Sequence, residues 1–268
     1  MLLKVSFKLN LLVLALLLTS ALVPVAATNS DTAKERRWAE QVIDGLLDGD
    51  DVWLIDDSGH EFLGILTEGD RSSGHAVVLL HGVGVHPNWP DVIYPLRAGL
   101  LERHITTLSL QMPILENEAD PREYVLLIPE VSGRIDAALD YLDDEGYRDI
   151  TLVGHSLGAS MAVYYLSHSD TDAVTSLVVI GMGPGIAATG SENLSALEQQ
   201  VKVPVLDLYG SADLEHVLNS VELRAAAGNR GSVPKYQQTK VNGANHFFQG
   251  HEDALVQQVV EWLEARQN

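Results

Sequence analysis

The chain has 268 residues, and its 37 acidic residues outnumber its 17 lysines and arginines, so the formal net charge is −20 at pH 7. This excess of acidic side chains argues against binding to nucleic acid, whose phosphates need Lys and Arg partners, and disfavours strongly anionic substrates and anionic membrane surfaces. The sequence contains no cysteine, which excludes disulfide bonds and metal sites built from thiolates.

Residues 1–27 have the pattern of a signal peptide. Two lysines precede an almost unbroken apolar stretch at 11–18, and Val25-Ala26-Ala27 supplies the small residues that signal peptidases require. An uncleaved membrane anchor is the alternative, but Pro24 and these small residues favour cleavage. We therefore predict an exported protein, periplasmic or secreted and without a stable membrane anchor, whose mature chain is residues 28–268.

The rest of the chain alternates β-branched runs with amphipathic segments. Residues 28–50 are expected to hold an N-terminal helix docked on the same domain, and residues 51–55 and 61–67 to pair as antiparallel strands. The following elements, in order, are a buried strand at 76–80, a helix at 91–103, a strand at 105–110, a helix at 124–144, a strand at 150–153, a helix at 157–167, strands at 174–180 and 203–209, a helix at 214–227, a strand at 236–241 and a helix at 252–266. This alternation predicts a single α/β domain over 28–268, with a mostly parallel sheet and helices on both faces.

A serine stands where one predicted strand meets the next predicted helix. Residues 154–158 read Gly-His-Ser-Leu-Gly, the G-x-S-x-G pattern. A sharp turn of this kind strains the serine backbone and places its Oγ above the carboxyl edge of the sheet, beside the free N–H groups of the helix N-terminus. Ser156 is therefore the candidate nucleophile.

A serine hydroxyl is a weak nucleophile, so a base must accept its proton. On a strand–turn–helix motif of this kind, the acid and then the histidine follow the serine along the chain. Of the ten histidines, only His246 and His251 follow the last predicted strand. His246 lies in the loop directly after that strand, whereas His251 begins the terminal helix, where a capping role is more typical. We predict that His246 is the base.

The acid that orients this histidine should follow the preceding strand. Asp213 stands in the loop after Gly210 and is the candidate acid, although it also suits the cap of the helix that starts at 214. Asp207 is the alternative, but it lies inside the strand, where a buried carboxylate needs a partner.

Two backbone amides are candidates for an oxyanion hole. One is the N–H of Leu157, directly after the serine, and the other is the N–H of Val83, in the loop after the strand at 76–80. Each donor of this kind is worth about 10²–10³ in rate. Three further residues of that loop either line the pocket mouth or pack at the surface: His86, Asn88 and Trp89.

The segment after the strand at 174–180 is short. Its Gly-Met-Gly-Pro-Gly run at 181–185 is a weak match to a nucleotide-binding loop, and we expect a mobile loop beside the site instead. Only 22 residues separate positions 180 and 203, which leaves no room for a large lid. This length predicts an open site for small or medium acyl substrates.

The segments 81–113, 153–160 and 236–263 give the chain a resemblance to the α/β-hydrolase superfamily, which extends over most of 51–266. The HPNWP sequence and the signal peptide most resemble a bacterial exported family catalogued as a domain of unknown function. The resemblance implies Ser156 as nucleophile, Asp213 as acid and His246 as base, in agreement with the residue patterns.

The expected chemistry is hydrolysis of an ester or related acyl bond through an acyl-enzyme, by a Ser-His-Asp triad that needs no metal and no organic cofactor. The expected partner is a small-molecule acyl substrate, and the sequence does not indicate an oligomeric state. Two alternatives remain open: a catalytically silent binding protein of the cell envelope, and an acyltransferase that uses the same triad.

Overall fold

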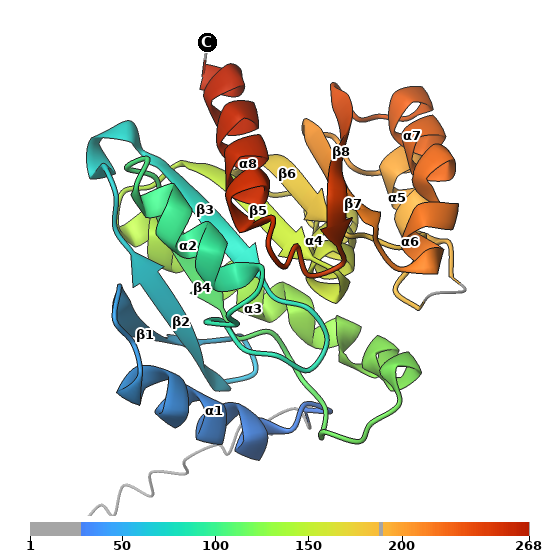
Figure 1. Cartoon of the computed structure of the whole chain (residues 1–268). Coiled ribbons are helices and arrows are strands. Elements are labelled where there is room, and N and C mark those ends of the chain that lie inside the picture. The colour runs from blue at the N-terminus through green and yellow to red at the C-terminus, as the bar shows by residue number, and fades with distance from the viewer. Residues whose placement is uncertain (1–27, 188–189, 268) are drawn as a thin grey trace, which may run out of the picture.

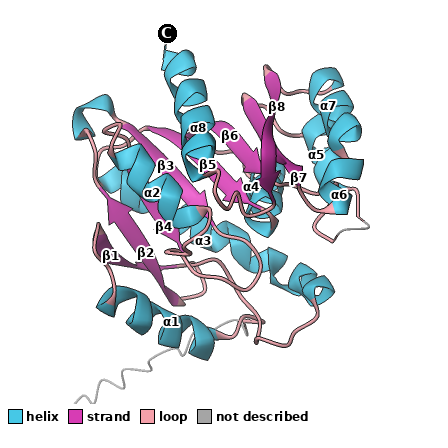
Figure 2. Ribbon diagram, in the orientation of Figure 1, coloured by secondary structure: helices cyan, strands magenta, loops and turns pink. Residues whose placement is uncertain are grey.

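The computed structural model describes residues 28–187 and 190–267, so the predicted signal peptide lies outside the described residues. At its centre is an eight-stranded sheet in the order β1-β2-β4-β3-β5-β6-β7-β8 (Figures 1 and 2). β2 pairs antiparallel with β1 and with β4, and all other neighbours are parallel, which confirms the predicted sheet. The strands are β1 (Asp50–Ile55), β2 (Glu61–Thr67), β3 (His75–Leu80), β4 (Thr106–Leu110), β5 (Asp149–His155), β6 (Val174–Ile180), β7 (Val205–Ala212) and β8 (Tyr236–Asn245).

Helices cover both faces of this sheet. The helices are α1 (Thr32–Asp44), α2 (Ile93–Leu101), α3 (Val131–Asp144), α4 (Leu157–His168), α5 (Glu192–Gln199), α6 (Glu215–Asn219), α7 (Val221–Arg230) and α8 (Glu252–Gln267), with 3₁₀ helices η1 (Arg71–Ser73) and η2 (Pro121–Glu130). α2 and α8 lie side by side on one face, and α3 and α4 cover the other (Figure 1). Within the described ranges, none of the helices combines the length and apolar character needed to cross a membrane.

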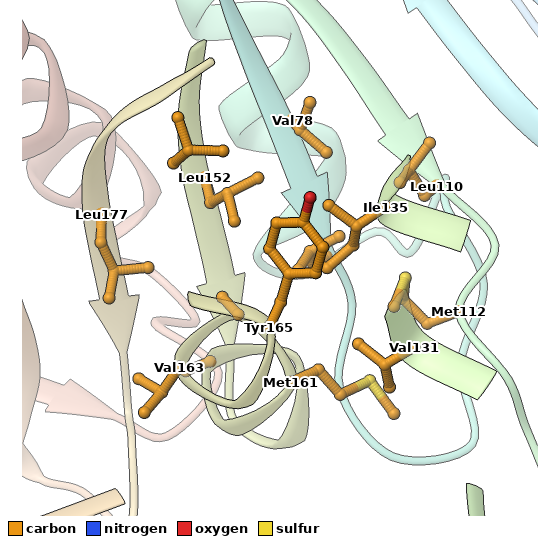
Figure 3. Close-up of a cluster of buried hydrophobic side chains, with 14 of the residues drawn as sticks. Val78, Leu110, Met112, Val131, Ile135, Leu152, Met161, Val163, Tyr165 and Leu177 are labelled. Carbon is orange, nitrogen blue, oxygen red and sulfur yellow. The ribbon is translucent and has the colours of Figure 1, made fainter. Parts of the chain in front are cut away.

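The alternation of side chains along the central strands fills two apolar layers. Val78 of β3 belongs to the cluster beneath α3 and α4, whereas its neighbours Val77 and Leu79 belong to the cluster beneath α2 and α8. Figure 3 shows the first layer, in which Tyr165 of α4 and Ile135 of α3 lie among side chains from the strands. β3 is buried over its whole length because both layers depend on it.

Two predicted helices are interrupted in the structure. The helix predicted at 124–144 is a 3₁₀ helix up to Glu130 and an α-helix only after it, because Pro129 lacks an N–H and disfavours the α conformation of the residue before it. The helix predicted at 214–227 divides at Ser220, whose hydroxyl donates to the carbonyl of Val217 at 3.0 Å. α5, in the short segment between β6 and β7, was not predicted, and the described part of that segment contains no large lid.

The expected N-terminal helix is α1, and it is fixed to the domain by a buried ion pair. Glu35 of α1 lies 2.9 Å from the guanidinium of Arg134 on α3, and both side chains are almost fully buried. His60, between β1 and β2, also contacts Glu35 at 2.9 Å. Burial alone would raise the pKa of Glu35, but the hydrogen bond from His60 and the charge of Arg134 outweigh it and hold this pKa below its usual value. One carboxylate therefore joins α1, α3 and the β1–β2 hairpin.

We expect Glu35→Ala to lower the free energy of unfolding by about 3 kcal/mol, because it removes the close carboxylate partner of the buried guanidinium of Arg134 and leaves only the more distant Glu130, at 3.9 Å. Urea unfolding followed by circular dichroism measures this change. The matched control is Glu40→Ala on the same helix, which removes a carboxylate 3.8 Å from exposed Arg36 and should cost less than about 1 kcal/mol. Equal losses in the two variants would contradict a special role for the buried pair.

Candidate active site

The turn from β5 into α4 holds Ser156 in an unusual backbone conformation, with φ 56° and ψ −117°. The N–H of Ser156 donates to the carbonyl of Ile180 on β6 at 2.8 Å, which anchors the turn to the neighbouring strand. A Cβ at Gly158 would overlap the carbonyl oxygen of Leu80, and one at Gly154 would overlap the backbone of Gly158. Gly158 therefore allows α4 to start directly against the end of β3, and Gly154 allows the end of β5 to lie close against the first turn of α4.

Ser156, His246 and Asp213 form a hydrogen-bonded chain across the carboxyl edge of the sheet. Nε2 of His246 lies 3.0 Å from Oγ of Ser156, and Nδ1 of His246 lies 2.6 Å from Oδ1 of Asp213. His246 follows the end of β8. Asp213 follows β7 without an intervening loop, because this strand extends to Ala212, three residues beyond its predicted end. In such a chain, an imidazole is positioned to accept the proton of a serine hydroxyl.

The local backbone favours the charged form of Asp213. Its carboxylate accepts hydrogen bonds from the N–H of Leu214 at 2.7 Å and the N–H of Gly210 at 3.3 Å. Burial alone would raise the pKa of Asp213, but the interaction with His246 and these two amides lower it below its usual value. An ionised carboxylate at this position can hold the Nδ1–H tautomer of His246 and stabilise an imidazolium.

The two amides predicted for an oxyanion hole lie at the same pocket as Ser156. Val83 and Leu157 both line this pocket, and within the described part of the chain neither backbone N–H donates a hydrogen bond. Gly82 brings the loop after β3 close, since a Cβ built there would lie 3.3 Å from Cβ of Ser156. Free N–H groups at the pocket that holds the serine are the donors that an oxyanion requires.

The pocket at Ser156 is a cavity of about 350 Å³ formed by the loops that follow several strands. Gly181, Gly183 and Gly185 of the segment after β6 form one wall, which places the predicted glycine run beside the site. Apolar side chains form much of the rest: Val83, Val85, Trp89, Leu157, Ile186, Leu214 and Phe247. Across 28–187 and 190–267, no three His, Asp or Glu side chains gather closely enough to hold a metal ion.

Two other residues considered as functional candidates contribute to structure elsewhere. Asp207 is fully buried, and its carboxylate pairs with Arg224 of α7 at 2.7 Å and accepts from Gln238 at 2.9 Å. This ion pair ties α7 to β7 and gives the buried carboxylate the partner that its position in the strand demands. His251 precedes α8, with its Nδ1 3.3 Å from the carbonyl of Gln249, and does not line the pocket.

The HPNWP sequence divides between the pocket and the surface. Trp89 lines the pocket, whereas His86 packs edge-on between Trp89 and Trp38 of α1, with ring centroids 5.4 Å apart in both pairs. Asn88 accepts a hydrogen bond from Arg97 of α2. Of the three residues considered at the pocket mouth, only Trp89 therefore contributes to the cavity.

His155 is a contributor that the sequence pattern did not identify. It occupies the variable position of G-x-S-x-G, and its Nε2 lies 3.0 Å from the backbone carbonyl of His246. A carbonyl oxygen only accepts, so His155 donates this hydrogen bond and fixes the backbone that carries His246. Burial, followed by the proximity of His246, lowers the pKa of His155 to about 4. The pattern marks this position as free, and only the fold shows what it contacts.

We expect the protein to lose stability as the pH falls below about 6.5, the usual pKa of an unfolded histidine. Because the pKa of His155 is about 4 in the folded state, the unfolded state binds the proton first, and this residue adds a slope of about 1.4 kcal/mol per pH unit between these values. Unfolding in urea from pH 8 to pH 4.5 measures the slope. His155→Gln should flatten it, and an unchanged slope in this variant would contradict the assignment.

The comparisons with known proteins agree with this fold. The sequence family described as "Protein of unknown function (DUF3530)" matches residues 9–132 and 126–265. An esterase from Pyrococcus furiosus is similar in structure, with a TM-score of 0.65 at 18% identity over 84% of this chain and 93% of that chain. A dienelactone hydrolase from Anabaena variabilis gives 0.62 at 20% identity, over 81% and 97%. A putative α/β-hydrolase of unknown function from Agrobacterium tumefaciens gives 0.63 at 19% identity, over 82% and 97%. No curated protein matches the chain.

Proposed function

Because the chain belongs to the DUF3530 family and has the α/β-hydrolase fold, we propose that it is a serine hydrolase that cleaves a small or medium ester or related acyl bond. The observation that carries this proposal is the hydrogen-bonded chain at the pocket, with 3.0 Å from Ser156 Oγ to His246 Nε2 and 2.6 Å from His246 Nδ1 to Asp213.

The first step of the proposed reaction is acylation of Ser156. As Oγ attacks the acyl carbonyl carbon, its proton passes to Nε2 of His246, and the carbonyl oxygen becomes an oxyanion at the amides of Val83 and Leu157. The imidazolium then donates this proton to the leaving alcohol, so the ester C–O bond breaks and an acyl-enzyme remains. Asp213 stays ionised and stabilises the imidazolium.

The second step releases the acid. Water loses a proton to Nε2 of His246 as its oxygen attacks the acyl carbon, and the same two amides stabilise the second oxyanion. His246 returns the proton to Oγ of Ser156 as the acyl–serine bond breaks. Every proton transfer uses Nε2 of His246. The hydrogen bond from the side chain of His155 to the backbone carbonyl of His246 therefore matters to both steps.

The size and lining of the pocket support a compact substrate. A cavity of about 350 Å³ accommodates a small or medium acyl ester. Among the described residues that line it, Arg122 alone is permanently charged, and it is exposed and paired with Asp120. The walls therefore favour an uncharged acyl group, and the described part of the segment between β6 and β7 contains no large lid that would close the site.

We expect a fluorophosphonate probe to add one phosphonyl group to the mature chain, residues 28–268, because His246 activates Ser156 without any need for the natural substrate. Intact-protein mass spectrometry measures the adduct. Ser156→Ala should show none, and Asp213→Asn should label far more slowly, in line with the ~10⁴-fold loss of turnover typical of this change.

The matched control for the base is a pair of histidine variants from one loop. His246→Ala should abolish rapid labelling, whereas His251→Ala should label at the wild-type rate because His251 lies outside the pocket. The absence of an adduct on folded wild-type protein would favour a catalytically silent binding protein. Ester products formed with added alcohols, in excess over the free acid, would instead favour an acyltransferase.

A further inference from the structure

A buried serine one helical turn beyond Ser156 is not used by the proposed reaction. Ser160 of α4 lines the pocket and is only 2% exposed. Asn193 of α5 is also buried, and its Nδ2 lies 2.8 Å from Oγ of Ser160 and 3.1 Å from the carbonyl oxygen of Gly183. The pocket wall therefore contains a fixed polar group among apolar neighbours.

The partners of Asn193 determine how the hydroxyl of Ser160 is used. A backbone carbonyl only accepts hydrogen bonds, so the side-chain nitrogen of Asn193, and not its oxygen, must face Gly183. The same nitrogen donates its second hydrogen to Ser160, whose oxygen is therefore an acceptor. Among the residues that the structure describes, none accepts the hydrogen of this hydroxyl. Ser160 thus presents a free donor at the pocket.

Ser160 and Ser156 line the same pocket, and we assign the wall at Ser160 to the acyl chain of the substrate. Ser160 follows Ser156 and Leu157 along α4, one turn or about 6 Å down the helix axis. In the acyl-enzyme the acyl chain is attached to Ser156, whereas the leaving alcohol departs past His246. A donor at this distance matches an oxygen on the third or fourth carbon of the acyl chain.

A second polar side chain near this wall is uncharged. His216 of α6 lines the pocket, and a Cβ on Gly183 would lie 2.9 Å from its Cδ2. Burial, with a further contribution from His246, lowers the pKa of His216. A neutral imidazole and a hydroxyl suit a neutral oxygen, because neither supplies the positive charge that a carboxylate would need.

We propose that Ser160, held by Asn193, donates a hydrogen bond to an uncharged oxygen on the acyl chain, so that the enzyme prefers hydroxyacyl or oxoacyl esters to plain alkyl esters of the same shape. This inference rests on the proposed function, because it assigns the substrate class of the same site.

The experiment compares esters that share the para-nitrophenyl leaving group and differ by one oxygen. The pairs are β-hydroxybutyrate against isovalerate, and levulinate against isocaproate. Wild-type kcat/KM should be about tenfold higher for the oxygenated member of at least one pair, as expected for the gain of one hydrogen bond. Ser160→Ala should remove this preference, with the loss falling on kcat/KM of the oxygenated member.

A second variant separates loss of the hydrogen-bond donor from an effect of misfolding. Ser160→Cys keeps nearly the same volume with a much weaker donor, so it should also lose the preference. Equal slowing of both members of a pair in the two variants would overturn the proposal and indicate a structural role. Absence of any preference in the wild type would also overturn it. Fluorophosphonate labelling separates the two proposals: labelled protein that turns over esters without preference defeats only this one, whereas unlabelled, inactive protein defeats both.

Discussion

The close contact between α4 and the end of β3 is the constraint on which the rest of the site depends. It exists because Gly158 has no side chain where the backbone meets the carbonyl oxygen of Leu80. Any larger residue would push the start of α4 away from β3, and with it the amide of Leu157 from the loop that carries Val83. The positive φ of Ser156 costs about 1–3 kcal/mol, and the hydrogen bond from its N–H to Ile180 on β6 helps to hold it. The strained backbone of Ser156 is thus held in place by its contacts with the sheet.

The order of the parallel strands gathers residues that are far apart in the chain. β5, β6, β7 and β8 are successive neighbours, so the segments that follow them meet at one edge of the sheet. This order brings His246 to Ser156 across 90 positions of sequence. The buried ion pair between Asp207 and Arg224 contributes to this gathering because it fixes α7 against β7. The short helix α6, which precedes α7 and carries His216, is thereby held at the pocket wall.

Much of this arrangement follows from the sequence, because the strong signals are local. The G-x-S-x-G pattern between a strand and a helix predicts where Ser156 lies. The order of the strands along the chain then predicts which strand ends carry Asp213 and His246, which the structure brings together. Contacts between distant side chains leave no such signal. The partner of Asp207 lies 17 positions away on another element, and His155 occupies a position that the pattern leaves free. The helix breaks depend on the missing N–H of Pro129 and on the hydrogen bond of the Ser220 hydroxyl to a backbone carbonyl. Hydrophobic periodicity alone does not reveal either of them.

The electrostatics of the site also fit the proposed chemistry better than binding of an ion. Burial lowers the pKa of His155 to about 4 and also lowers that of His216, so these two imidazoles stay neutral beside His246 at neutral pH. The ionised carboxylate of Asp213 then acts directly on His246. An imidazolium that forms at His246 is stabilised by that carboxylate, and an oxyanion at Ser156 by backbone amides. In a pocket of this kind, new charges develop only while a neutral substrate reacts. The site therefore stabilises the transition state more than the ground state.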